Sequence, residues 1–112
     1  MDPVLFHNNE EGRQAFVDLA SRAVLWIADY YRNIENYPVR SQVLPGDIYK
    51  QFPAQFPAQP VTDDEVFRIL QEVIIPGMTH WQHPGFYAFF PGNTSFPSIV
   101  AEMVTAGMSA QC

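Results

Sequence analysis

The positions of the prolines constrain this chain more than any other feature of its sequence. Five of its ten prolines lie between residues 38 and 60, and three more lie between residues 80 and 97. Proline has no amide hydrogen to donate, and it disfavours helical backbone in the residue before it. Long helices are therefore restricted to the stretches outside these two segments, and we expect a mainly α-helical chain with two irregular connections.

These breaks divide the 112 residues into five segments. They are an N-terminal amphipathic helix at 1–37, a proline-rich connector at 38–61, a second helix at 62–79, an aromatic loop at 80–97, and the start of a buried helix at 98–112. In the first segment apolar residues recur at helical spacing from about residue 10 to residue 36, which predicts one long helix ended by Pro38. The stripe is wide enough to need more than one packing partner.

The connector contains the repeat QFPAQFPAQP. Its proline spacing is compatible with a polyproline ligand for a signalling domain. We favour the alternative that Phe52 and Phe56 anchor the connector to a globular surface. Residues 46–52 are predicted to form one short helical turn.

Start and stop signals frame the two later helices. Thr62 with Glu65 three residues on predicts a capping box, and Pro76-Gly77 is predicted to end that helix. Ser95 or Phe96 is predicted to begin the last helix, with Pro97 in its first turn. Because the last helix is apolar nearly all round, we expect it to be buried within a larger fold that continues beyond the sequence.

Composition excludes several classes of protein. With 47% hydrophobic and 16% charged residues the chain is unlike a disordered acidic tail, and six basic residues against a net charge of −6 argue against nucleic-acid binding. The single cysteine, Cys112, cannot form an internal disulfide, so we expect a cytoplasmic protein. We expect no membrane span, because no apolar run approaches the roughly 20 residues that a bilayer requires.

Nearly the whole sequence resembles a known family. The matching residues are Asp29-Tyr30-Tyr31, Tyr37-Pro38-Val39, Pro45-Gly46-Asp47, and the run IIPGMTHWQHPGFYAFFP at 74–91. This pattern is similar to that of the group II pyridoxal-phosphate (PLP) dependent amino-acid decarboxylases, which include the aromatic-L-amino-acid, tyrosine and histidine decarboxylases. The run is long and unusual in composition, and the resemblance extends from about residue 10 to the end of the chain.

The resemblance implies a fold type I homodimer whose N-terminal helical segment wraps over the partner subunit, truncated here before the large α/β PLP domain. It also implies that the segment after the His-Trp motif lines the pocket for an aromatic L-amino acid. The matching positions are Trp81, Phe89, Phe90, Pro91 and Gly92. Many family members have Tyr at the position of Phe89, and the animal enzymes have Thr at that of Gly92, so the substrate is left open.

PLP chemistry in this family requires a lysine that binds the cofactor covalently, together with an acidic residue and a histidine beside the ring. In the family these residues lie far downstream of the matching region. Lys50 is the only lysine of the chain, and its polar setting in PGDIYKQF gives no apolar pocket to lower its pKa. We therefore expect neither a catalytic nor a cofactor-binding residue in this chain.

Two alternatives concern the residues of the aromatic loop. His80 and His83 have the spacing of a metal-binding pair, but a structural zinc site needs four ligands, so we predict no metal. We expect instead that His80 hydrogen-bonds the backbone and that His83 lies near the mouth of the pocket. By periodicity alone the aromatic cluster is ordinary core, and only the resemblance assigns part of it to the substrate.

Two functions are compatible with the sequence. In the first, the chain is the N-terminal part of a PLP-dependent carboxy-lyase and contributes dimer contacts and pocket walls. In the second, it is a non-catalytic product that pairs with a full-length relative as an interaction module. In either case we expect the isolated chain to self-associate through the apolar surface of residues 99–108.

Overall fold

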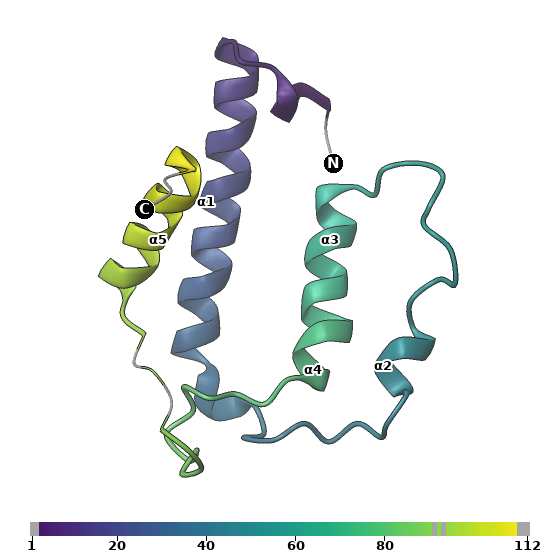
Figure 1. Ribbon diagram of the computed structural model, residues 1–112, viewed down its shortest axis with the longest axis vertical. Helices are drawn as coiled ribbons and strands as arrows, with labels where there is room; N and C mark the ends of the chain where they lie inside the picture. The colour runs from purple at the N-terminus through teal and green to yellow at the C-terminus, as the bar shows by residue number, and fades with distance from the viewer. Residues whose placement is uncertain (1–2, 91, 93, 110–112) are drawn as a thin grey trace.

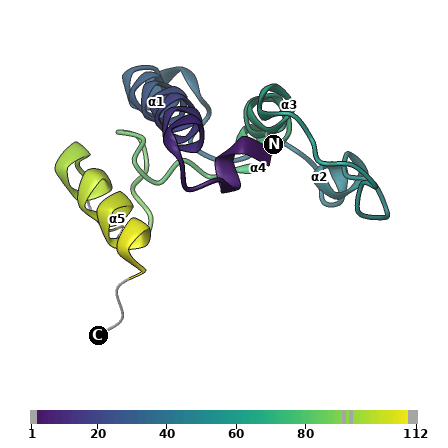
Figure 2. The same cartoon turned by 90° about the horizontal axis from the view of Figure 1, so that it is seen from above.

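The computed structural model describes residues 3–90, 92 and 94–109, and in these ranges the regular structure is entirely helical. The elements are η1 (Pro3–Phe6), α1 (Glu10–Arg32), η2 (Ile34–Asn36), α2 (Asp47–Lys50), α3 (Asp63–Ile69), η3 (Leu70–Ile74), α4 (Ile75–Gly77) and α5 (Phe96–Met108). Helix α1 lies between the continuous helix α3–η3–α4 on one side and α5 on the other (Figures 1 and 2). No helix among the described residues is both long enough and apolar enough to cross a membrane.

Helix α1 begins at a well-formed cap. The side chain of Asn9 accepts a hydrogen bond of 2.9 Å from the amide of Gly12, and Glu10 and Glu11 lie near the positive end of the helix dipole. Gly12 is buried where the carbonyl of His7 comes too close for any Cβ atom. The helix was predicted to run to about residue 36, but α-helical backbone ends at Arg32 and the 3-10 turn η2 follows.

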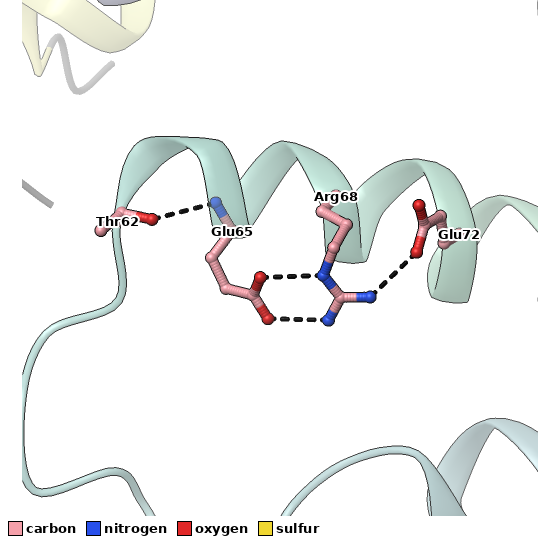
Figure 3. Close-up of polar contacts among 4 residues, drawn as sticks. All are labelled: Thr62, Glu65, Arg68 and Glu72. Atoms are coloured by element: carbon pink, nitrogen blue, oxygen red, sulfur yellow. Dashed lines mark hydrogen bonds and ion pairs between the residues drawn. The ribbon is translucent and has the colours of Figure 1, made fainter.

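The second helix begins at Thr62, as predicted, because its hydroxyl accepts a hydrogen bond from the Glu65 amide (Figure 3). The reciprocal half of the predicted capping box is replaced by another pairing. The Glu65 carboxylate lies along the helix and accepts two hydrogen bonds from Arg68, which also binds Glu72. These bonds from Arg68 hold the pKa of Glu65 below its usual value.

A π-helical turn, η3, allows this helix to continue through a proline. The Ile75 amide bonds the Leu70 carbonyl, five residues back, and Pro76 follows in the last turn, where it donates nothing. The helix ends at Gly77, and Met78 is extended. The predicted stop at Pro76-Gly77 therefore lies at the glycine.

The buried side chains gather where the end of α1 meets η3 and α4. Ile34, Val73, Ile75 and His80 are less than 9% exposed. With the rings of Tyr30 and Tyr37, which lie against His80, we call this group the His80 junction. Its place between the two long helices explains why the aromatic loop, which begins at His80, starts from a fixed point.

The first half of the connector contacts α4, because the Ser41 hydroxyl donates to the Pro76 carbonyl and the Ile48 side chain lies against Gly77, whereas its second half loops away from the helices (Figure 1). The predicted turn is present as α2, after Gly46 in the left-handed conformation. Phe56 is fully exposed, so the prediction that it anchors the connector is wrong for this chain, and Phe52 is only partly covered. A hollow of about 520 Å³ lies between residues 51–57 and α3, because the connector arches over the helix without packing on it.

Helix α5 begins as predicted, with Ser95 as its cap and Pro97 in its first turn. Ser95 and Ser98 form a capping box that the sequence reasoning missed. The helix contacts α1 through the edge of Phe96 against Tyr31, at 5.8 Å between ring centroids, and an apolar seam of about 250 Å³ separates the two. None of its described residues is buried by this chain, so the expected burial within a larger fold stays a prediction.

Candidate functional site

The aromatic loop presents a stack of rings to solvent. Trp81 lies 5.1 Å from Phe86 and 5.8 Å from Phe89, measured between ring centroids, and both rings are nearly parallel to the indole. Trp81 is nevertheless 48% exposed. The stack is therefore ordered by its own contacts while leaving apolar ring surface free.

The backbone of Phe89 is unusual, because its φ of 59° lies in the left-handed region that favours glycine. This conformation accompanies a ring that is tilted only 11° from the plane of Trp81. Backbone strain of this kind persists only where the surroundings hold it, and it concentrates at functional sites. Phe89 is thus the predicted pocket residue whose local geometry is most distinctive.

The remaining predicted pocket residues are Phe90, Pro91 and Gly92, and the structure describes the first and the last of them. Phe90 is fully exposed. The Gly92 carbonyl accepts a hydrogen bond of 2.8 Å from the Gln82 side chain, which closes the loop, while Pro91 lies outside the described residues. The structure therefore brings Trp81 and Phe89 together and leaves Phe90 projecting alone; the assignment of these positions to a substrate stays a prediction.

His80 fixes the beginning of the loop to α1. Its Nδ1 atom lies 2.6 Å from the hydroxyl of Tyr30, its ring stacks on Tyr37 at 4.9 Å, and its backbone amide donates to the Val39 carbonyl. Burial lowers the pKa of His80, with a smaller contribution from His83, and burial raises the pKa of Tyr30. The ring of His80 was predicted to bond the backbone; it binds a tyrosine instead, because α1 places Tyr30 directly opposite.

His83 has the role that was predicted for His80. Its Nδ1 atom accepts a hydrogen bond of 2.8 Å from the backbone amide of Gly85. Within the described ranges there is no group of three or more His, Cys, Asp or Glu residues that could hold a metal ion. Both histidine rings bond groups of this chain, and the position of His83 at a pocket mouth stays a prediction.

Lys50 does not fit a PLP-binding role. It lies at the end of the four-residue helix α2, and its side chain is exposed. Burial in an apolar pocket or a neighbouring cation is what lowers the pKa of a reactive lysine, and an exposed residue on a connector lacks the first of these. Among the described residues the aromatic stack offers an apolar surface for an aromatic ring, and the exposed Lys50 lacks the burial that would make it reactive.

Sequence reasoning missed the partners of His80. The matched pattern contained Tyr30 and Tyr37, but nothing in their spacing indicates that residues 50 and 43 positions apart from His80 would meet its ring. Trp26 and Gln71 were missed for the same reason, although the Trp26 indole donates to Gln71 at 3.1 Å. Long-range polar pairs of this kind depend on how helices pack.

Comparison with known proteins gives consistent matches. The family model described as the pyridoxal-dependent decarboxylase conserved domain matches residues 45–111. The chain is 42% identical over 97 residues to an aromatic-L-amino-acid decarboxylase of Catharanthus roseus, and 46% identical over 83 residues to a phenylacetaldehyde synthase of Arabidopsis thaliana. These matches cover 87% and 74% of this chain but only 19% and 17% of the relatives.

Solved structures agree with the sequence matches. The crystal structure of Catharanthus roseus tryptophan decarboxylase with L-tryptophan superposes with a TM-score of 0.85 at 41% identity, over 93% of this chain and 21% of that one. Rhodiola rosea 4-hydroxyphenylacetaldehyde synthase superposes with a TM-score of 0.82 at 31% identity, over 86% and 21%. The chain therefore spans about a fifth of the length of the relatives that it matches.

Proposed function

This chain belongs to the pyridoxal-dependent decarboxylase family, and from that premise we propose that it forms the N-terminal part of a PLP-dependent carboxy-lyase acting on an aromatic L-amino acid. In this role it supplies walls of the substrate pocket and contacts to a partner subunit. The relatives include enzymes named as decarboxylases and enzymes named as aldehyde synthases. The proposal takes its substrate class and its reaction from the relatives that are named as decarboxylases.

The observation that carries the proposal is the exposed, ordered stack of Trp81 with Phe86 and Phe89. Aromatic rings prefer offset stacked or edge-on partners and gain roughly 0.5–1.5 kcal/mol per pair beyond simple burial. The stack therefore suits the ring of an aromatic substrate. It has no acid, base or nucleophile of its own, so its contribution is to bind and orient.

The cofactor is proposed to bind to the part of the enzyme beyond this segment, because Lys50 is exposed and unsuited to it. When bound, PLP supplies the electron sink that accepts the electron pair left by departing CO2. This segment supports the reaction by positioning the substrate ring and by excluding water from one side of the pocket.

The exposed apolar faces support the proposed subunit contacts. In α5 these side chains are Phe96, Val100, Met103, Val104 and Met108, and in α1 they are Phe16, Val17, Val24 and Leu25. Contiguous apolar patches beyond a few hundred Å² mark interaction sites on soluble proteins. A homodimer of the complete enzyme would cover them, and they equally suit the alternative in which the chain pairs with a full-length relative.

A chimera tests the proposed function. The matching segment of the Catharanthus roseus aromatic-L-amino-acid decarboxylase is replaced by this chain, and decarboxylation of L-tryptophan is measured. We expect an active chimera in which Trp81→Ala lowers kcat/KM about tenfold, equivalent to roughly 1.4 kcal/mol of lost binding.

Tyr87→Ala is the matched control, because Tyr87 lies in the same loop but is 91% exposed and outside the predicted pocket set. It should leave kcat/KM within about twofold of the unmodified chimera. The proposal fails if the two substitutions have the same effect in an active, folded chimera.

A further inference from the structure

His80 is the one polar side chain that the structure buries within the described residues, and it is only 1% exposed. Buried polar groups are costly unless they find hydrogen-bond partners. His80 has such a partner in Tyr30, at 2.6 Å. The most deeply buried side chain of the described residues is therefore an imidazole and not an aliphatic group.

The contacts of His80 belong to a closed circuit of side chains. The indole of Trp26 donates to Gln71, the Gln71 amide donates to the Tyr37 hydroxyl, and Tyr37 stacks on His80. His80 bonds Tyr30, whose ring stacks on Trp26 at 5.5 Å and 10°. The circuit joins α1, the segment after η2, the π-turn η3 and the first residue of the aromatic loop.

The next residue along the chain is Trp81, the centre of the aromatic stack. The backbone of His80 is fixed on both sides, since its amide donates to Val39 and its carbonyl accepts from the His83 amide. A side chain locked at this position therefore sets where the adjacent Trp81 leaves the helical part of the molecule.

We infer that His80 is a positioning residue, which holds the Trp81 stack at a fixed place against α1 through its hydrogen bond to Tyr30 and its stacking on Tyr37. This inference deepens the proposed function and rests on it only in naming Trp81 as a pocket wall. His80 itself does not touch the substrate in this role.

In this inference the position of the Trp81 stack depends on the charge of the His80 imidazole. The titratable groups in contact with His80 are Tyr30 from α1, Tyr37 from the segment after η2, and His83 from the loop, and none of these is a carboxylate. Asp29, beside Tyr30 on α1, is exposed, so water screens its charge. A proton on His80 would therefore place an uncompensated charge in a buried site.

The sign of the pH effect follows from the lowered pKa of His80. Above the unfolded-state pKa of about 6.5 the imidazole is neutral in both states, and the junction keeps its full stability. As the pH falls below that value the unfolded chain takes up a proton that the folded junction resists. Stability is lost progressively until the pH has passed the folded-state pKa.

The test uses the 112-residue chain labelled with 5-fluorotryptophan, whose two tryptophans give separate 19F signals. Trp81→Phe assigns them. In the unmodified chain the Trp81 signal is expected to move toward its denatured-state position as the pH falls from 7.5 to 5. His80→Ala should produce that shift already at pH 7.5, and His80→Asn, whose amide oxygen can replace Nδ1 as the partner of Tyr30, should restore the position and abolish the titration.

His83→Asn is the matched control in the same loop, since His83 bonds the Gly85 amide and not α1; it should leave the titration of the Trp81 signal in place. If His80→Ala prevents folding, Tyr30→Phe removes only the hydroxyl and should shift the Trp81 signal in the same direction. A Trp81 signal that keeps its position in folded His80→Ala, or that titrates unchanged in His80→Asn, overturns the inference.

These readouts need neither substrate nor cofactor, so they separate the two claims. An inactive chimera with the predicted 19F behaviour would refute the proposed function and leave the positioning role of His80 intact. An active chimera together with a Trp81 signal that does not move would refute the positioning role of His80 and leave the proposed function intact.

Discussion

The His80 junction and helix α5 are both rich in apolar residues, yet they differ in how far their side chains are buried. At the junction Val73 and Ile75 are at most 5% exposed, and the polar groups beside them are paired. In α5 no described side chain is buried, although its cap is complete. Local helix signals are thus satisfied in both regions, and what separates them is whether this chain alone supplies the packing partner.

The largest expected difference comes from truncating one apolar side chain in each region. Ile75→Ala should lower the free energy of unfolding by about 3 kcal/mol, because it removes methyl groups and leaves a cavity in the junction. Val100→Ala in α5 should cost less than about 0.5 kcal/mol, since Val100 is already more than half exposed. Urea denaturation of both variants measures the contrast, and equal losses would show that the two regions are not distinct.

A charge on α5 should act on association and leave folding unchanged. Val104→Glu is expected to weaken self-association of the chain about tenfold or more, because burying a valine between copies contributes roughly 1.5 kcal/mol. Thr105→Glu adds the same charge one residue further on and should have a smaller effect. Sedimentation equilibrium measures the self-association constant of each variant. An unchanged association constant in Val104→Glu would show that the chain associates through another surface.

The caps of the two helices provide a finer comparison. Thr62→Ala should reduce global stability by about 1 kcal/mol, because α3 leads directly into the junction. Ser95→Ala removes an equally regular cap but should only fray α5, with no change in the global unfolding midpoint. Thr62→Ser, which keeps the hydroxyl, should behave like the unmodified chain, and a global loss in Ser95→Ala would mean that α5 unfolds together with the rest.

The smallest effect is expected at the exposed ion pairs of α3. Arg68 contacts Glu65 and Glu72 on the surface of the helix (Figure 3). Surface pairs contribute little, because water and salt screen them and two long side chains must be ordered. Arg68→Met should therefore leave the unfolding midpoint unchanged within error. A clear downward shift of the midpoint would show that these ion pairs contribute more to the free energy of unfolding than their exposed geometry predicts.

The sequence predicted the parts of the fold that depend on neighbouring residues. Thr62 was identified as a helix start because an N-cap acts on amides two or three residues away, and the last helix was predicted to begin at Ser95 or Phe96 because Pro97 suits a first turn. The family pattern assigned Trp81 and Phe89 to a substrate pocket; the structure stacks their rings, and the assignment to a substrate stays a prediction.

What the sequence did not predict depends on long-range packing. The Tyr30 partner of His80 lies 50 residues earlier in the sequence. The carboxylate of Glu65 accepts hydrogen bonds from Arg68 and not from the amide of the capping residue. Phe56 was expected to anchor the connector, but an aromatic residue needs a surface to bind, and this chain leaves it in solvent. The burial of α5 within a larger fold was predicted from its composition; this chain alone does not supply the packing partner, so that burial stays a prediction.

Amide hydrogen exchange of the dilute 112-residue chain tests the central claim most directly, because it measures opening of each region separately. We expect slow exchange at the His80 junction, in the C-terminal half of α1 and in η3–α4, and fast exchange throughout α5. Slowing of α5 as the concentration rises would accompany association through its apolar face. Equal protection of α5 and the junction in dilute monomeric chain would contradict the account, since it would mean that α5 is stabilised by contacts within this chain.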